Sequence, residues 1–488
     1  MIEILLLLSY TSVLIGFFLY CLMELGLAIQ YIRCYGKKNK VVLPLPNPLP
    51  MVTLQLPVYN EFYVVSRLLD AVGELNYPKD RLDIQLLDDS TDETTDLGAE
   101  GIQKLCDNGF SARQIKRNQR TGYKAGALQN GLKTAKGEFI AFFDADFIPD
   151  KNFLMNTLPT FRRPEVACVQ TRWTHINASY SLLTRVQAFF LDAHFTVQHS
   201  GRICSGGFIN FNGTAGVWRK DAITDTGGWC ADTLAEDLDL SYRAQMKGWK
   251  IVYLGDMCSP AELPVSMQAL KSQQYRWIKG GAETAKKLLP SLFSSGLSPT
   301  ILLLAIGHLM SSTVYVLILF LMLLSLPLVW YKNTTIPVEY KYYLLPFLLS
   351  NVAVVFSYFT ASVVPAPNRL KATLQFLWVM PLFFIITMGL SFHNAIAALS
   401  GWCGIKTPFV RTPKFNLCSD NTHWKSKLYN ESHARWSVAG EFFMFIYCAA
   451  AVVAAFCRQE FFMTPMHLLG ILGYGTVLVL SIRHRASQ

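Results

Sequence analysis

The stretch FIAFFDADF, residues 139–147, decides the fold of this chain. The apolar run from Phe139 to Phe143 has the length of a buried strand, and two carboxylates spaced by one residue follow it. Upstream, Val52–Val58 and Leu82–Leu87 are also typical of strands, and helical patterns cover 61–75 and 122–135. Strands that alternate with helices predict an α/β domain with a mostly parallel sheet, covered by helices. We expect a ligand site at the carboxyl ends of its strands.

Acidic residues fall at these strand ends. Asp88 and Asp89 follow one strand, and Asp144 and Asp146 follow another, so carboxylates from two strands are expected at one edge of the sheet. Hard oxygen ligands in this arrangement suit Mg²⁺ or Mn²⁺, which can also hold a diphosphate. Taken alone, the acidic pair fits helix capping or hydration as well as metal binding.

Three further motifs contain residues suited to chemistry. In RTGYKAGAL, residues 120–128, two glycines flank Lys124 just before a helix, an arrangement that can hold phosphate oxygens but lacks the spacing of a P-loop. In AEDLD, residues 235–239, acids begin a helix and either complement its dipole or supply a base for a hydroxyl group. In QQYRW, residues 273–277, Arg276 can bond diphosphate oxygens and Trp277 can stack on a sugar face, although both residue types also anchor membrane boundaries.

Composition divides the chain into three parts. Hydrophobic residues make up 51% of it and gather at both ends, so membrane spans are expected around a soluble domain. We expect an N-terminal anchor at 1–34, a soluble domain at 45–295 and a C-terminal membrane bundle at 296–488. The formal net charge is +10, and many of the basic residues flank apolar segments, a pattern that indicates cytoplasmic flanks and membrane lipids as neighbours, and no nucleic acid.

Several segments are long enough to cross a bilayer. The apolar run 4–32 is too long for a signal peptide, and four later stretches also qualify, although Glu441 interrupts one of them and is expected either to be functional or to reach the headgroups. The four are 301–331, 342–364, 434–457 and 461–482. Segment 374–400 contains His393 and Asn394 and leads into a basic stretch, so we expect an interfacial or re-entrant helix. Five crossings then leave the soluble domain and residues 403–433 in the cytoplasm, and a sixth crossing remains open.

The eleven cysteines show no Cys-x-x-Cys pair and no histidine cluster with metal spacing. A disulfide scaffold or a zinc site is therefore not expected, and free thiols in a reducing compartment are.

Taken in order, these motifs resemble the processive family 2 glycosyltransferases, in particular the cellulose-synthase-like group that makes mannan, glucomannan and related β-linked backbones. The resemblance spans about 50–280 and weakens toward 415. It rests on seven blocks: VYNE at 58–61, LDDSTD at 87–92, GYKAGAL at 122–128, FDADF at 143–147, FNGTAG at 211–216, Glu236-Asp237 and QQYRW at 273–277. The fold that it implies is a GT-A type, Rossmann-like domain inserted between transmembrane helices.

The resemblance also implies roles for individual residues. Donor binding would fall to Tyr59, Glu61, Asp88, Asp89, Lys124, Asp144, Gln273 and Arg276. Asp144 and Asp146 would hold Mg²⁺ or Mn²⁺, and Asp237, beside Glu236, would be the catalytic base. Acceptor binding would fall to Trp277, Phe211, Asn212, Gly213 and Thr214.

A gating-like loop is expected at 403–416. Its FVRTPK stretch, residues 409–414, is similar to the loop that covers the donor in cellulose synthases, which implies roles for Phe409, Thr412 and Lys414. Two positions depart from the pattern. Arg411 stands where Val is usual, and Ala235 stands where many relatives have Thr, which puts a contact by that hydroxyl in doubt.

The expected function is that of a membrane-integrated inverting glycosyltransferase. It would use a nucleotide-sugar donor of the UDP-glucose or GDP-mannose type to elongate a β-linked glycan, with secretion of the product coupled to its synthesis. A non-processive transferase that acts on a lipid acceptor, such as diacylglycerol or ceramide, is the alternative. A non-catalytic transporter or receptor is a more remote alternative, because it does not explain the full set of acidic residues.

Overall fold

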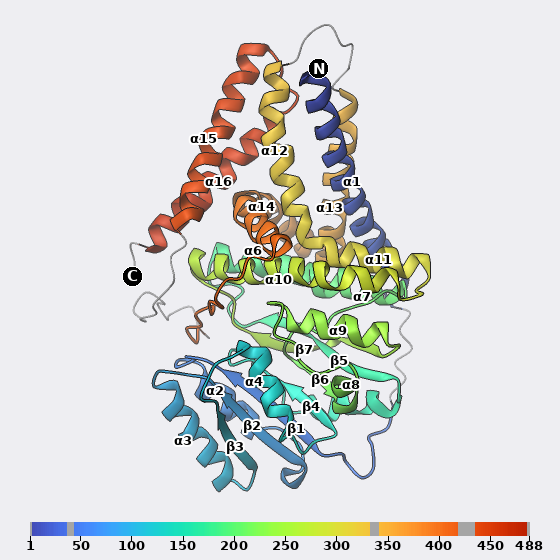
Figure 1. Ribbon diagram of the computed structural model, residues 1–488, viewed down its shortest axis with the longest axis vertical. Coiled ribbons are helices and arrows are strands. Elements are labelled where there is room, and N and C mark those ends of the chain that lie inside the picture. The colour runs from blue at the N-terminus through green and yellow to red at the C-terminus, as the bar shows by residue number, and fades with distance from the viewer. Residues whose placement is uncertain (1, 37–42, 332–340, 418–434, 486–488) are drawn as a thin grey trace.

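A seven-stranded mixed sheet forms the centre of the soluble half of the molecule (Figure 1). The computed structural model describes residues 2–36, 43–331, 341–417 and 435–485. The strand order is β3-β2-β1-β4-β6-β5-β7, in which β3, β2, β1 and β4 run parallel and β6 is antiparallel to both of its neighbours. The strands are β1 Val52–Val58, β2 Leu82–Asp88, β3 Ser111–Lys116, β4 Phe139–Phe142, β5 Val166–His175, β6 Gly216–Arg219 and β7 Lys250–Ala261. The predicted α/β class is confirmed.

Two layers of helices cover the two faces of this sheet. Apolar side chains of α2 (Val65–Gly73) and α3 (Thr94–Asp107) pack on one face, against alternate residues of β1 and β2. On the other face lie α4 (Tyr123–Leu132), α8 (Lys220–Asp225) and α9 (Glu236–Met246), packed around the fully buried Trp218. Although both faces are covered, β1 and β2 alternate apolar and polar residues. The buried polar side chains pair across the two strands: Thr53 Oγ1 donates to Asp83 Oδ2 at 2.9 Å, and Gln55 Nε2 donates to Gln85 Oε1 at 3.0 Å. Short helical elements complete this half: η1 Lys79–Arg81, α5 Phe153–Thr157 and η2 Leu158–Arg162.

The parallel strands end at one edge of the sheet. Val58 at the end of β1 pairs with Asp88 at the end of β2, and β4 runs parallel to β1 on its other side. Asp89 and Asp144 therefore leave the sheet at the same edge, which faces the membrane half of the molecule (Figure 1). This edge carries the candidate site.

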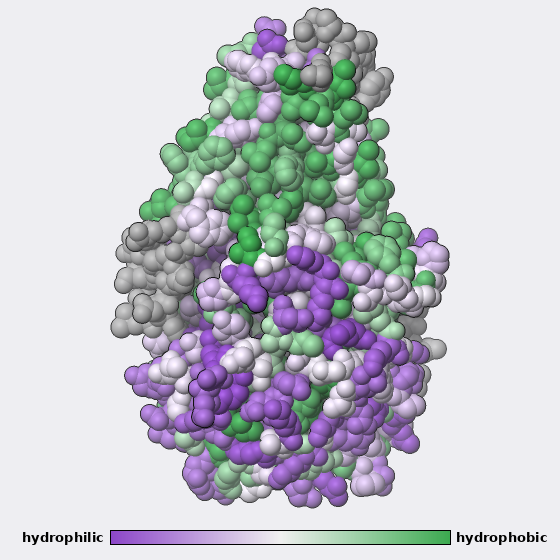
Figure 2. Space-filling model, viewed as in Figure 1, coloured by the Kyte–Doolittle hydropathy of each residue, from purple (hydrophilic) through white to green (hydrophobic). Residues whose placement is uncertain are grey.

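Long helices build the other half. They are α1 Ile2–Cys34, α12 Val314–Tyr331, α13 Lys341–Val363, α14 Arg369–Cys403, α15 Arg435–Arg458 and α16 Thr464–Arg485. Between the halves lie α6 Leu182–Ala193, η3 His194–Gln198, α7 His199–Cys204, α10 Met267–Phe293, α11 Pro299–Leu309 and η4 Met310–Thr313. Figure 2 shows hydrophobic residues gathered over the helical half and hydrophilic residues over the half that holds the sheet. In the described part of the chain, six segments are long and apolar enough to cross a membrane.

The predicted single span at 301–331 is divided in two. α11 lies beside α10 at the boundary of the halves, whereas α12 runs up the bundle beside α1 (Figure 1). The 3₁₀ turn η4, with the sequence MSST, separates them. Short polar side chains compete for backbone hydrogen bonds, so a bend at this point has a local cause. The eighteen residues of α12 are alone long enough for a crossing.

Segment 374–400 lies within one continuous helix, α14, so it has no re-entrant turn. By length and composition α14 is one of the six candidate spans, with Pro381 near its middle. Figure 1 shows α14 almost end-on, whereas α1, α12 and α15 are seen lengthwise. The interfacial placement of this helix stays a prediction.

One pair of cysteines corrects the expectation of free thiols. Cys34 at the end of α1 and Cys204 at the end of α7 form a disulfide, with their Cα atoms 6.4 Å apart. The other eight cysteines of the described residues are free. Nothing in the spacing of 170 residues between the two partners points to this pairing, because it depends on α1 packing against α7.

Glu441 lies inside the bundle, which excludes the predicted alternative of a side chain that reaches the headgroups. It is fully buried on α15 and accepts hydrogen bonds from Ser437 Oγ at 2.8 Å and from Lys271 Nζ on α10 at 2.5 Å. Lys271 also donates to Ser481 Oγ on α16 at 2.7 Å. Lys271 therefore connects the boundary helix α10 to two helices of the bundle, to α15 through a buried ion pair and to α16 through a hydrogen bond.

We expect Lys271→Met to destabilise the protein by about 3–5 kcal/mol, because it leaves the buried carboxylate of Glu441 without a counter-charge. The double variant Lys271→Met/Glu441→Leu should recover most of this loss. Unfolding in mixed detergent micelles measures both. The exposed pair Lys104–Asp70, 2.6 Å apart, is the control, and Asp70→Asn should change stability by less than about 0.5 kcal/mol. Equal effects of the two single variants would contradict a structural role for the buried pair.

Candidate functional site

A cavity of about 230 Å³ opens at the carboxyl edge of the sheet. Most of the residues singled out in the sequence line it: Tyr59, Glu61, Asp89, Lys124, Asp144, Asp146, Asn212, Gly213, Glu236, Asp237, Gln273, Arg276, Trp277, Phe409, Thr412 and Lys414. They come from segments more than 300 residues apart in the chain. Asp144, Asp237 and Trp277 share this one hollow, which is the arrangement that an enzyme interpretation requires.

Lys124 is the cation at the floor of the cavity. Gly122 precedes α4 with a φ of 73°, a conformation that glycine adopts without strain, and it turns the chain into the helix that carries Lys124. The lysine Nζ donates to Asp144 Oδ1 at 2.6 Å and to the carbonyl of Gly213 at 3.0 Å. Burial opposes the charge of Lys124, but the carboxylates of Asp144 and Glu236 outweigh it and raise the lysine pKa. Lys124 is therefore a fixed positive charge.

Asp237 and Glu236 enter the cavity from the first turn of α9. Burial, together with the neighbouring charge of Glu236, raises the pKa of Asp237 from 3.8 to about 7. Burial also raises the pKa of Glu236 and that of Asp144. A carboxyl group with a pKa near neutrality can both accept and release a proton at physiological pH. Asp237 is the acid of this cavity best suited to general base chemistry.

Gly213 sets the distance between the base and the loop that faces it. Its φ is 80°, and a Cβ at this position would lie 2.9 Å from Asp237 Oδ2 and 3.4 Å from Lys124 Nζ. Any other residue at position 213 would therefore have a strained backbone conformation, and its side chain would displace the carboxylate of Asp237. The requirement for glycine in FNGT follows from this contact.

The second acidic pair fits a metal ion. Asp144 and Asp146 follow β4, line the same cavity and are spaced by one residue, so they offer hard oxygen ligands of the kind that Mg²⁺ or Mn²⁺ prefers. Lys414 Nζ donates to Asp146 Oδ2 at 2.6 Å, and Lys124 holds one oxygen of Asp144. Each carboxylate has a second oxygen to offer to a cation.

Residues 404–417 form a loop that lies over the cavity, and we call it the covering loop. Arg276 on α10 donates to the carbonyl of Val410 at 2.9 Å and to Thr412 Oγ1 at 2.7 Å. Arg411 forms a two-pronged ion pair with Glu61, at 2.8 and 2.7 Å. The departure from Val at position 411 thus adds a contact between the covering loop and the end of β1 that valine cannot make.

Aromatic and guanidinium groups are stacked at one side of the cavity. The guanidinium of Arg120 lies 3.3 Å from the ring centre of Tyr59, and Phe409 of the covering loop stacks on Tyr123 with ring centres 5.4 Å apart. Flat groups of this kind suit a planar ligand such as a nucleobase.

A second cavity of about 390 Å³ adjoins the first and extends into the helical bundle. Asp237, Asn212 and Trp277 line both, as do Trp173, Leu191 and Ala235. Many of its other lining residues come from α1, α12, α13 and α14, and several of these are aromatic. Asp237 therefore lies where the polar cavity meets the cavity that extends into the helical bundle.

Three predicted site residues lie outside the cavities. Phe211 is fully buried among Phe142, Trp218 and Trp229, so it cannot line an acceptor path. Thr214 is also buried, and its Oγ1 accepts from the backbone N–H of Asp144 at 2.8 Å, so it positions the backbone of Asp144 instead. Asp88 is 3% exposed and accepts hydrogen bonds from Ser90, Thr95 and Gln114, a structural role at the end of β2.

Other residues were missed by the sequence analysis. Arg120 lines the cavity beside Tyr59, and Arg117 forms an ion pair with Asp89. Glu262, at the end of β7, is 2% exposed and accepts from the backbone N–H of Phe415 at 2.7 Å, which anchors the covering loop. Arg120 begins the motif that contains Lys124 and was available as a signal, whereas Glu262 lies in no motif.

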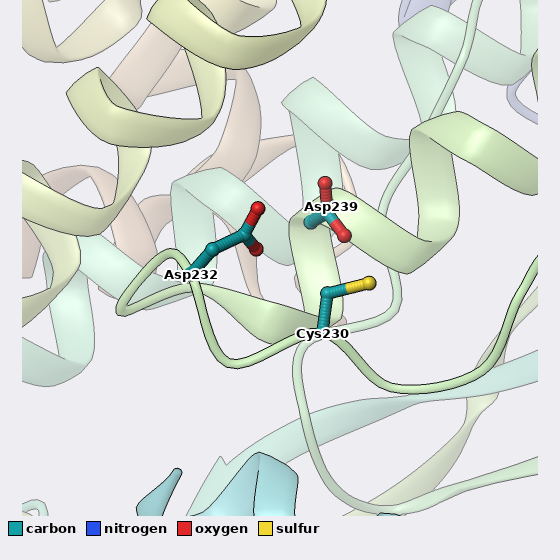
Figure 3. Close-up of side chains that lie close together, drawn as sticks. All are labelled: Cys230, Asp232 and Asp239. Atoms are coloured by element: carbon teal, nitrogen blue, oxygen red, sulfur yellow. The ribbon is translucent and has the colours of Figure 1, made fainter.

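A third acidic group lies outside both cavities and resembles a metal site only by its residue types (Figure 3). Ligand atoms of Cys230, Asp232 and Asp239 lie within 4.8 Å of one another. Lys287 Nζ, however, is 2.9 Å from Asp232 and 2.8 Å from Asp239, and Arg243 also pairs with Asp239. These cations already neutralise the carboxylates, so the group is a salt-bridge network.

Known proteins resemble the central part of this chain. Residues 50–280 match the family model described as "Glycosyltransferase like family 2". Probable glucomannan 4-beta-mannosyltransferase 7 of Oryza sativa subsp. japonica is 45% identical over 244 residues, which are 49% of this chain and 42% of that protein. Glucomannan 4-beta-mannosyltransferase 2 of Arabidopsis thaliana is 43% identical over 245 residues, 49% of this chain and 46% of that protein. The aligned part is thus less than half the length of either relative.

A solved structure supports the fold. The mannosyltransferase PcManGT from Pyrobaculum calidifontis, in complex with GDP-Man and Mn²⁺, superposes with a TM-score of 0.53 over 82% of this chain and 100% of that chain, at 17% sequence identity. At this identity the likeness shows the GT-A fold alone. Together with the family model and the relatives, it confirms the resemblance drawn from the motifs: residues 50–280 of this chain are similar to the family 2 glycosyltransferases.

Proposed function

We propose that this protein transfers a sugar from a nucleotide-sugar donor to a growing β-linked glycan, with inversion at the sugar carbon. One observation carries the proposal. Asp237, with a pKa raised to about 7, stands between the polar cavity that holds Lys124, Asp144 and Arg276 and the aromatic cavity that extends into the bundle. A base in this place can activate an acceptor hydroxyl that arrives from the bundle against a donor bound over the sheet.

Different residues of the chain have different roles in a single displacement at the sugar carbon. Asp237 takes the proton of the acceptor hydroxyl as the oxygen attacks the sugar carbon from the face opposite the leaving group. Lys124 and Arg276 stabilise the negative charge that develops on the departing diphosphate. Mg²⁺ or Mn²⁺ held by Asp144 and Asp146 would neutralise part of that charge. Burial lowers the pKa of Arg276 to about 10, which still leaves the guanidinium charged at neutral pH.

The donor site is assigned to the part of the cavity under the covering loop. Tyr59, Arg120 and Phe409 offer flat faces for a nucleobase, and Asp89 and Glu61 are carboxylates suited to sugar hydroxyls or base N–H groups. UDP-glucose and GDP-mannose types both fit this description. The names of the matched relatives favour a mannose donor and a glucomannan-type product.

The acceptor site is assigned to Trp277, Asn212 and Gly213, with the product entering the larger cavity. A Trp face can pack against the C–H face of a sugar, and the cavity leads away from the donor. We propose that the catalytic domain faces the cytoplasm, supported by the basic residues beside α1 and α16, and that elongation is coupled to passage through the bundle.

The competing proposal is a transferase with a lipid acceptor, favoured by the apolar character of the larger cavity. Incubation with labelled donor and a divalent metal separates the two. A product that stays out of organic solvent and is degraded by mannan- or glucan-specific hydrolases supports the glycan. A product that extracts into organic solvent supports the lipid.

Asp237→Asn should lower kcat by about a hundred-fold to ten-thousand-fold, the usual contribution of a general base, while donor binding is retained. Initial rates with labelled donor measure the loss, and nucleotide protection against thermal unfolding measures donor binding. Asp221→Asn is the control, because Asp221 is an exposed acid that also lies in the first turn of a helix. Unchanged turnover in Asp237→Asn would overturn the assignment of the base.

The activity should rise with pH and level off above a midpoint near 7, because Asp237 accepts a proton only when it is ionised. Glu236→Gln should move this midpoint to lower pH, since the charge of Glu236 is one cause of the raised pKa. A pH profile of kcat/KM for the acceptor checks both. The raised pKa also means that wild-type stability should fall, relative to Asp237→Asn, as pH rises from about 4 to about 7. A midpoint that Glu236→Gln leaves unmoved would contradict this cause.

Gly213→Ala should lower kcat by about a hundred-fold, because the added methyl meets Asp237 Oδ2 and shifts the base. Gly206→Ala is the matched control. Gly206 also has a positive φ, of 70°, but its Cβ would meet nothing within 4 Å. Similar backbone strain with different activity would show that the contact with Asp237, and not the strain, is responsible. Equal activity of the two variants would argue against it.

A further inference from the structure

A buried lysine lies on α10, two residues after Trp277, and lines neither of the two cavities. This lysine, Lys279, is 1% exposed. Its Nζ donates to Thr407 Oγ1 at 2.6 Å and lies 3.5 Å from Glu283 Oε1. Removing an ammonium group from water is costly, so buried lysines are rare unless they are paired. The two partners of Lys279 should therefore explain its position.

Glu283, one turn further along α10, contacts the segment that carries the base. Its second oxygen, Oε2, accepts from the backbone N–H of Leu234 at 2.8 Å, three residues before Asp237. The helix also lies close to this segment, because a Cβ at Gly280 would be 2.8 Å from the backbone N of Ala235. α10 thus fixes the backbone immediately before the first turn of α9.

Thr407 connects Lys279 to the start of the covering loop. It precedes Phe409 by two residues, and the ring of Phe409 stacks on Tyr123 beside the proposed site of the nucleobase. The end of α14, which leads into the loop, is also close to α10, since a Cβ at Gly401 would be 2.7 Å from the carbonyl oxygen of Lys279. One buried ammonium group therefore lies between the covering loop and the segment before the base.

A purely helical role does not account for these contacts. Acidic and basic side chains four residues apart on a helix often pair at its surface and need no function. Here the ammonium group is buried, and both members of the pair also bond to segments outside their own helix. Thr407 and Leu234 lie more than 170 residues apart in the chain, yet each is within three residues of a group assigned to the reaction.

We propose that Lys279 and Glu283 are positioning residues for the transfer reaction, and this rests on the proposed function. Glu283 fixes the backbone that leads to Asp237, so that the carboxylate of Asp237 keeps its place beside the acceptor hydroxyl. Lys279 holds Glu283 and the start of the covering loop in one place. Neither side chain touches the substrates, because neither lines the cavities.

The first test compares two substitutions of Glu283 in the full-length protein in nanodiscs, by initial rates with labelled donor. Glu283→Met removes the acceptor for the Leu234 N–H and should lower kcat by about ten-fold to a hundred-fold, because a small displacement of a catalytic group is costly. Glu283→Gln keeps an oxygen that can accept this N–H and should recover most of the turnover. The donor KM should change by less than about three-fold in both variants, since the donor contacts are intact. Thermal unfolding checks that each variant is folded.

The second test concerns the start of the covering loop. Thr407→Val keeps the shape of the side chain but removes the oxygen that accepts from Lys279, so Phe409 is held less firmly. The donor KM should then rise by about ten-fold, the usual effect of losing one charged hydrogen bond. Thr407→Ser keeps the oxygen and should have the donor KM of the wild type.

Thr313→Val is the matched control for this test and should leave the donor KM unchanged. Thr313 Oγ1 also accepts one side-chain hydrogen bond near the end of α14, from Trp402 Nε1 at 3.2 Å, and Thr313 lines neither cavity.

Substitution of the lysine itself links the two tests. Lys279→Met should combine a lower kcat with a higher donor KM. In that background, Thr407→Val should have no further effect on the donor KM, since the hydroxyl has already lost its partner. Additive effects of the two substitutions would overturn the connection through Lys279.

The proposal is also overturned if Glu283→Met and Glu283→Gln have the same kcat, or if Thr407→Val has the donor KM of the wild type. If Lys279→Met does not fold, the Glu283 and Thr407 variants still decide the outcome. Failure of the proposed function is distinct, because it would appear as absent sugar transfer in the wild type. Protection by GDP or UDP with Mn²⁺ against thermal unfolding would then still measure the effect of Thr407→Val on nucleotide binding.

Discussion

The charge balance around Lys124 is the constraint on which the candidate site depends. Its ammonium group, only partly exposed, contacts Asp144 and the carbonyl of Gly213, and it lies in the field of Glu236 and Asp237. Three carboxylates so close together would repel one another and take up protons. Lys124 offsets part of this repulsion, so the acids can stay in one cavity while Asp237 still keeps a pKa near neutrality. Removing that cation would alter the metal pair and the base together.

The sequence was sufficient wherever the chain places chemistry at the end of a predicted strand. Parallel strands bring their carboxyl ends to one edge, so the meeting of Asp89 and Asp144 followed from the order of strands and helices alone. The sequence could not show which of Asp88 and Asp89 lines the cavity, because neighbouring side chains in an extended segment point in opposite directions. The same alternation sends Phe211 into the core and leaves Asn212 at the cavity. A motif thus located the right segment without telling which of its side chains reach the ligand.

Contacts between distant segments could not be predicted from the sequence. Glu262 anchors the covering loop across more than 150 residues of sequence, and Arg411 reaches Glu61 across 350. No periodicity or spacing encodes such pairings, since they depend on how α10 and the bundle sit on the sheet. The Cys34–Cys204 pair belongs to the same class. The break between α11 and α12 is different, because its cause is local. Hydropathy gives the length of an apolar segment and says nothing of a bend made by short polar residues within it.

Burial links the raised pKa of Asp237 to the larger cavity, which we propose as the path of the product. Desolvation is the largest cause of the raised pKa of Asp237, and Asp237 is also a wall of the cavity that extends into the bundle. Helices of the membrane half close over the edge of the sheet and so keep water away from the carboxyl group. The same helices enclose the space that we assign to the glycan. A chain that filled this space would exclude still more water and would raise the pKa of Asp237 further. Base strength would then depend on whether a product occupies the bundle, which couples each transfer to the glycan made by the transfers before it.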